Sequence, residues 1–88
     1  MNEPVLPALE YPLDYTFKVM GLAADDFEAH ARALVERALG AEAIEVRVRA
    51  SAGGKYQSVS VVARLEREDQ RRAVYVALKA DPRVVYYL

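Results

Sequence analysis

The chain has 88 residues, with twelve Lys and Arg against thirteen Asp and Glu, and its formal net charge is −1. This length accommodates one domain and excludes a multidomain enzyme, while the near-neutral charge provides no global field that would attract nucleic acid or an anionic membrane. The 53% of hydrophobic residues indicates a globular domain, and the absence of cysteine excludes disulfide scaffolds and thiolate metal sites.

Residues 1–13 are predicted to form an extended N-terminal arm, because Pro4, Pro7 and Pro12 each fix their own φ and disfavour helix before them. Residues 14–88 are expected to form a single domain. The prolines and acidic residues of the arm interrupt any apolar run of the signal-peptide kind, and no stretch reaches the ~18 apolar residues of a bilayer span. We therefore expect a cytoplasmic protein with no membrane partner.

Residues 14–20 alternate apolar and polar side chains, which predicts a half-buried strand that ends at Gly21. A helix is predicted next, because Asp25 followed three positions later by Glu28 matches a capping box, and Gly40 is the expected left-handed stop. The predicted inner face of this helix follows helical spacing: Phe27, Ala31, Leu34, Val35 and Ala38.

Residues 44–49 alternate again, which predicts a strand with a charged face and a buried face. The residues predicted to be buried are Ile44, Val46 and Val48. Residues 51–55 are expected to connect this strand to a return strand in a β-hairpin. The inward-facing residues predicted for the return strand are Val59, Val61, Ala63 and Leu65.

A second helix is predicted over residues 67–79, with Glu68 and Arg72 as an outer ion pair and Asp81-Pro82 as its end. The predicted inner face consists of Ala73, Val76, Ala77 and Ala80. The β-branched and aromatic run 84–88 predicts a final strand.

The element order β-α-β-β-α-β is typical of the split βαβ, or ferredoxin-like, α+β fold. Right-handed crossovers place the first and third strands at the centre of a four-stranded antiparallel sheet, with both helices on one face. The other face of the sheet is expected to stay open.

The open face is predicted to combine basic, hydroxyl and aromatic side chains. They are Lys18, Met20, Arg47, Arg49, Tyr56, Ser58, Ser60 and Arg64, together with tyrosines of the last strand. Such a face suits self-association or a protein partner, with Arg47, Arg49, Ser60 and Arg64 as the candidate contact residues. Single-stranded RNA is a weaker alternative, because the run Tyr56-Gln57-Ser58-Val59-Ser60 lacks the paired aromatics of RNA-recognition sheets.

No catalytic, metal or cofactor site is expected. His30 is the only histidine, so the chain offers no Ser-His-Asp set or second imidazole, and we predict a solvated residue on the helix surface. The acidic residues at 25–26 and 66–69 lie at predicted helix starts, where the macrodipole accounts for them. An enzyme is the least favoured class of function.

The hairpin loop from Ser51 to Tyr56 is a candidate anion site. The glycines Gly53 and Gly54 expose backbone amides, Ser51 supplies a hydroxyl and Lys55 a positive charge. The loop lacks the spacing of a phosphate-binding loop, and a turn that needs a positive φ explains its glycines equally well.

Three runs of the sequence resemble the YbeD-like family of small bacterial proteins: Glu10-Tyr11-Pro12, Tyr15-Thr16-Phe17-Lys18-Val19-Met20-Gly21 and the run from Ser51 to Ser60. The resemblance implies a ferredoxin-like fold similar to ACT regulatory domains, with no established activity. It also implies a regulatory role, linked to lipoate metabolism by genomic neighbourhood.

Seven residues fall on motif positions of that family: Lys18, Met20, Gly21, Ser51, Gly54, Tyr56 and Ser58. The chain departs from the motif where Ala52 replaces the usual serine and Gly53 the usual lysine, with Lys55 two places later. ACT-like domains bind amino acids near the loop after the first strand, which here is 21–24, although Gly21 is also explained as a strand terminator.

The resemblance and the residues together favour a non-enzymatic regulatory domain that senses a small-molecule effector and acts through a protein partner or self-association. An interaction module without a small ligand is the alternative, and binding of single-stranded RNA ranks third.

Overall fold

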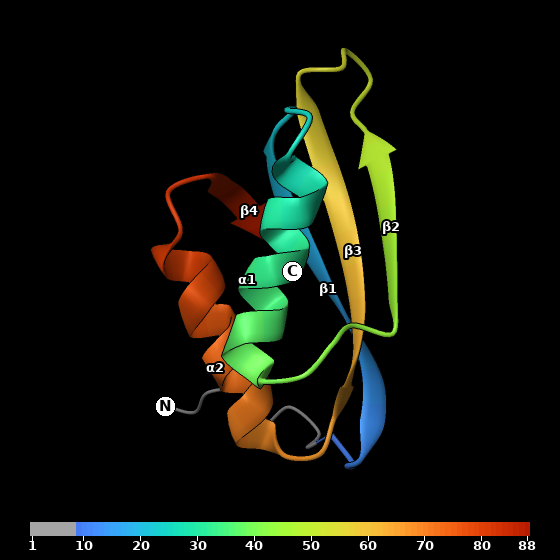
Figure 1. Ribbon diagram of the computed structural model, residues 1–88, viewed down its shortest axis with the longest axis vertical. Coiled ribbons are helices and arrows are strands. Elements are labelled where there is room, and N and C mark those ends of the chain that lie inside the picture. Colours follow the sequence, from blue (N-terminus) through green and yellow to red (C-terminus); the bar gives the residue numbers. More distant parts are fainter. Residues whose placement is uncertain (1–8) are drawn as a thin grey trace, which may run out of the picture.

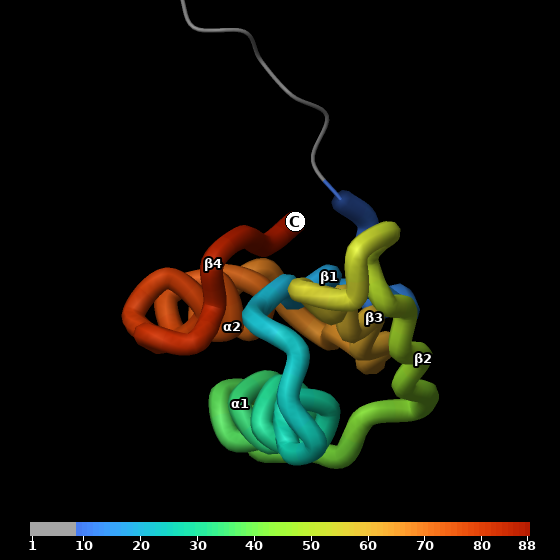
Figure 2. The backbone as a smooth tube through the Cα atoms, turned by 90° about the horizontal axis from the view of Figure 1, so that it is seen from above, coloured from blue at the N-terminus to red at the C-terminus, as the bar shows by residue number. Residues whose placement is uncertain are grey.

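The computed structural model describes residues 9–88, so most of the predicted N-terminal arm lies outside the described residues. The elements are β1 (Leu13–Leu22), α1 (Phe27–Leu39), β2 (Glu45–Ala50), β3 (Tyr56–Leu65), α2 (Glu68–Ala80) and β4 (Val84–Tyr87). The four strands form an antiparallel sheet in the order β2-β3-β1-β4. Both helices cover one face of this sheet (Figures 1 and 2), which confirms the ferredoxin-like βαββαβ architecture.

The core lies between the helices and the two central strands. Phe17 and Val19 of β1 and Val59 and Val61 of β3 are fully buried, because they occupy alternate positions on the covered face. The helices contribute Phe27, Ala31, Leu34, Val35, Val74 and Leu78. No helix within residues 9–88 is long and apolar enough to cross a membrane.

The predicted inner face of α1 and its stop are confirmed, but its start is not. Gly40 ends the helix with φ 71° and donates its amide to the Glu36 carbonyl. The N-cap is Asp26, whose side chain makes no capping hydrogen bond, so the predicted capping box of Asp25 and Glu28 is wrong. The Asp26 carboxylate instead accepts hydrogen bonds from the Arg83 guanidinium at 2.9 and 3.2 Å.

The face predicted for α2 is mostly wrong, because of its four residues only Ala77 packs against the core, while Ala73, Val76 and Ala80 are exposed. Val74 and Leu78 are fully buried, whereas Val76, predicted to be inside, is 68% exposed. The face of α2 that meets the core contains the buried Val74 and Leu78 and the half-buried Arg71 and Tyr75, at the i, i+3, i+4, i+7 spacing of one helical face. Arg71 and Tyr75 carry polar groups, so this face does not stand out as apolar in the sequence. The alanines and Val76 therefore suggested a different face.

Two predictions about the strands are also wrong. β1 continues through Gly21 to Leu22, so this glycine does not end the strand. β2 is an edge strand that neither helix covers (Figures 1 and 2). Ile44, just before this strand, and Val48 within it were predicted to be buried, but they are 57% and 41% exposed.

A cluster of polar and aromatic side chains joins the chain before β1 to α2. Tyr11 donates to Glu68, which also accepts two hydrogen bonds from Arg71 at 3.1 and 2.8 Å. The Arg71 guanidinium lies over the rings of Tyr15 and Tyr75, and their hydroxyl oxygens are 2.8 Å apart. The predicted pair of Glu68 with Arg72 exists at 3.6 Å, but Arg71 is the closer partner.

This cluster predicts acid sensitivity. Hydrogen bonds from Arg71 and then from Tyr11 lower the pKa of Glu68 from 4.5 to about 2. Because the folded pKa lies below the unfolded value, the stabilisation is present above about pH 4.5 and is lost as the pH falls toward 2. Glu68→Gln should therefore flatten the fall of Tm across this range, and Glu42→Gln, at an exposed loop position, should leave it steep. Equal acid slopes in both variants would contradict this assignment.

Candidate binding site

The open face of the sheet carries two rows of side chains across three strands. Register places Met20, Ser58 and Arg49 opposite one another, and it places Lys18, Ser60 and Arg47 in the next row. In each row the small serine lies on the central strand β3, between longer side chains of β1 and β2.

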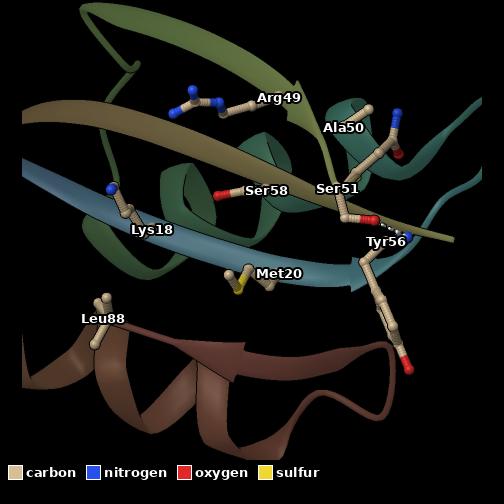
Figure 3. A pocket seen from close by; sticks show the side chains of 9 residues that line it. Lys18, Met20, Arg49, Ala50, Ser51, Tyr56, Ser58 and Leu88 are labelled. Carbon is tan, nitrogen blue, oxygen red and sulfur yellow. Dashed lines mark hydrogen bonds between the residues drawn. The ribbon is translucent and has the colours of Figure 1, made fainter. Parts of the chain in front are cut away.

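This arrangement hollows the face along β3, because a serine reaches less far from the sheet than its neighbours. Two adjoining hollows of about 330 and 400 Å³ share Lys18, Arg49 and Ser58. We call this surface the open-face groove, formed by the side chains of Lys18, Met20, Arg47, Arg49, Ser58 and Ser60. Figure 3 shows Lys18, Ser58 and Arg49 projecting from three neighbouring strands and lining one pocket.

The groove carries positive charge from three side chains, Lys18, Arg47 and Arg49. Arg47 pairs with Glu45 at 2.7 Å, whereas Lys18 and Arg49 make no ion pair with any residue in the range 9–88. Met20 and Leu88 add apolar surface to the same hollow, and Leu88 lies beside Lys18, with which it exchanges backbone hydrogen bonds. The groove can therefore contact an anionic group and an apolar group at the same time.

The structure places Ser51 and Tyr56 at the rim of the groove and directs other predicted residues elsewhere. The Ser51 hydroxyl accepts from the Tyr56 amide at 3.1 Å, and the Gly54 amide donates to the Ser51 carbonyl at 2.9 Å. Gly54 has φ 75°, which fits a hairpin turn that needs a positive φ. Gly53, Gly54 and Lys55 do not line the groove, and Lys55 lies over the Tyr56 ring.

Gly21 and the loop that follows it lie apart from the groove. Gly21 is buried against the Phe27 ring on the helix side of the sheet. The next amides are already engaged, since Ala23 donates to the Lys55 carbonyl and Ala24 to the Gln57 side chain. The amides of Ala23 and Ala24 therefore already donate hydrogen bonds within the fold and do not point toward a ligand.

Arg64 also lies outside the groove, near the opposite end of β3. It pairs with Asp14 at 3.3 Å and with Glu66 at 3.8 Å. Leu88 is a lining residue that sequence analysis did not select. Its backbone exchanges two hydrogen bonds with Lys18, and this pairing of β1 with the chain end had no sequence signal beyond the predicted final strand.

His30 is not the solvated residue that the sequence suggested. Its Nε2 lies 2.9 Å from a carboxylate oxygen of Asp81, and 24% of its side chain is exposed. Burial raises the pKa of Asp81, but hydrogen bonds from His30 and from the Arg83 amide outweigh burial and hold this pKa below its ordinary value. The pair ties α1 to the end of α2. Within residues 9–88, no three His, Asp or Glu side chains gather into a metal-binding group.

Comparison with known proteins places the chain in a family. A family model described as Protein of unknown function (DUF493) matches residues 7–88. The chain belongs to this family. This DUF493 chain is 37% identical over 78 residues to UPF0250 protein RSc0326 of Ralstonia nicotianae, covering 86% of this chain and 79% of that protein. It is 36% identical over 88 residues to a UPF0250 protein of a Janthinobacterium species, covering 98% and 96%.

The DUF493 fold also matches a solved structure. The solution structure of protein HP0495 from H. pylori has a TM-score of 0.74 to this chain at 19% identity, covering 94% of this chain and 88% of that one. This similarity supports the fold assignment. The family match and the UPF0250 relatives confirm the resemblance to YbeD-like proteins.

Proposed function

We propose that this DUF493 protein is a non-catalytic regulatory module that binds a small amphipathic anion in the open-face groove. The observation that carries the proposal is the pair of cations Lys18 and Arg49, unpaired within residues 9–88, beside the small floor residue Ser58. A carboxylate or phosphate between them gains charge-assisted hydrogen bonds from both side chains.

The size and polarity of the groove favour a small molecule with an apolar body. Each hollow, at about 330 and 400 Å³, falls within the range of ~300–1,000 Å³ typical of small-molecule sites. An anionic head at Lys18 and Arg49 leaves the rest of the ligand over Met20 and Leu88. Octanoate and lipoate fit this description, and the link to lipoate metabolism suggested by the family resemblance makes them the first ligands to test.

A binding role rather than a catalytic role is supported by the chemistry of the lining. The side chains that form the two hollows offer cations, hydroxyls, an amide and apolar groups. General acid–base catalysis usually employs an imidazole or a carboxylate at the substrate, and residues 9–88 contribute neither to this lining. In this proposal, the ligand acts by changing how β1, β3 and β2 are presented to a partner.

Thermal denaturation tests this function. Octanoate, lipoate, amino acids and inorganic phosphate are added separately to the full chain. A ligand at about 100 times its Kd adds ~2.7 kcal/mol, which should raise the Tm of a domain of this size by on the order of ten degrees.

Two variants locate the site. Lys18→Gln should abolish the shift, and Lys79→Gln, the same change on the exposed surface of α2, should preserve it. A flat response to the whole panel, or a shift that survives Lys18→Gln, would overturn the proposal.

A further inference from the structure

β2 presents a backbone edge with which no other strand within residues 9–88 pairs. It pairs with β3 on one side and forms the end of the sheet on the other. The amide of Ser51 donates to the Tyr56 carbonyl at 2.9 Å, which fixes these two residues as a hydrogen-bonded pair. Bonded and non-bonded pairs alternate in an antiparallel ladder. The N–H and C=O groups of Val46, Val48 and Ala50 therefore point away from β3.

The helix side of β2, together with Ile44 just before it, is apolar and only partly covered by residues 9–88. Ile44 and Val48 are 57% and 41% exposed, and Val46 between them is half-buried. Figures 1 and 2 show that neither helix reaches over β2. A segment added along this edge would gain backbone hydrogen bonds and would also cover apolar surface.

The opposite side of β2 is basic. Arg47 and Arg49 are exposed there, and only Arg47 has an acidic partner among residues 9–88, namely Glu45. Side chains directly opposite on adjacent strands have their Cβ atoms ~4.5–5.5 Å apart, and opposite charges there are stabilising. The added strand that matches β2 thus presents carboxylates toward Arg47 and Arg49, and it presents apolar side chains at the intervening positions.

We propose that β2 is a docking edge for an extended segment of a partner protein in which acidic and apolar residues alternate. The segment adds a fifth strand to the sheet, with affinity from backbone hydrogen bonds and selectivity from side chains on alternate faces. The proposal shares Arg47 and Arg49 with the groove. It does not require ligand binding there, because the outward amides and the helix side of β2 lie outside the groove.

A second copy of this chain matches the edge less well. Two copies of β2 paired antiparallel around Arg47 place this arginine opposite its own copy, and pairing around Val48 places Arg47 opposite Arg49. Pairing around Val46 sets Glu45 opposite Arg47, but it uses only residues 45–47 of each strand. Like charges directly opposite one another destabilise a strand pair. Charge complementarity thus favours an acidic segment.

The test is an NMR titration of the full, isotope-labelled chain with a blocked peptide of alternating glutamate and valine. We expect the amides of Val46, Val48 and Ala50 to shift and to become slower in hydrogen exchange when the peptide is bound. A peptide of alternating lysine and valine, which keeps the strand propensity and reverses the charge, should bind at least about tenfold more weakly.

A matched pair of variants controls for folding. Val48→Glu places a carboxylate on the edge and should weaken binding of the glutamate peptide at least about tenfold, whereas Val76→Glu, at a residue 68% exposed on α2, should leave it unchanged. The comparison of the two peptides uses the unsubstituted protein, so it tests the proposal even if a variant fails to fold. Absence of shifts along β2 into the millimolar range, or equal affinity for the two peptides, would overturn the proposal. Sedimentation as a dimer with these amides already protected would also overturn it, by assigning the edge to a second copy.

Discussion

Gly21→Ala should be among the most destabilising single changes in this domain. A Cβ on this residue would lie 2.5 Å from the Arg83 carbonyl oxygen and 2.5 Å from the Phe27 ring. Neither neighbour can move cheaply, because one is backbone and the other is a fully buried side chain. We expect a loss of at least ~2 kcal/mol, or on the order of ten degrees in Tm, measured by thermal unfolding followed by circular dichroism.

Gly53→Ala is the matched control. A Cβ at Gly53 meets nothing within 4 Å, and this glycine does not have a positive φ. The substitution should be neutral or should stabilise by up to ~1 kcal/mol, through the reduced entropy of the unfolded chain. Similar Tm values for the two variants would contradict the close packing of Gly21 against the Phe27 ring and the Arg83 carbonyl.

Leu78→Ala should have the other large effect. Leu78 is fully buried between α2 and the core strands. Removing a buried leucine side chain costs ~2–5 kcal/mol through lost transfer energy and the cavity left behind. That is a large part of the ~5–15 kcal/mol by which domains are stable. Urea unfolding should show a lower midpoint with little change in the slope.

The control for Leu78→Ala is Val76→Ala, on the same helix. Val76 is 68% exposed, so its truncation should change the free energy of unfolding by less than ~0.5 kcal/mol. The pair distinguishes the face that α2 presents to the core from the face that sequence analysis predicted. If Val76→Ala were as unstable as Leu78→Ala, α2 would have to present Val76 to the core, as the sequence predicted.

The fold was predictable because its strongest signals are local. Alternation along β1 and β3 and helical spacing along α1 each follow from residues next to one another in the sequence. The buried face of α2 was not predictable in this way, because Arg71 and Tyr75 lie on it. Their burial depends on contacts with Glu68 and Tyr15, and Tyr15 is distant in the sequence.

The exposure of β2 was not predictable from the sequence for a similar reason. Ile44, Val46 and Val48 alternate as buried strand residues do, but burial also needs a helix above the strand. Only the placement of α1 and α2 in space shows that neither helix reaches this edge.

The open-face groove was partly predictable. The selected residues Lys18, Met20 and Ser58 lie together in it, since strand alternation fixes the face of each. Gly21 has the opposite orientation and lies on the covered face. The hollow itself depends on the register between strands, which sets the serines of β3 between longer neighbours and cannot be read from any one strand.

Binding in the groove is the central claim, and an NMR titration of the full chain with octanoate tests it most directly. Saturable shifts confined to the amides of Lys18, Met20, Ser58 and Arg49 are the predicted result, with smaller shifts for inorganic phosphate, which lacks the apolar body. Unchanged amides along these three strands, or shifts confined to the start of α1, would contradict the claim.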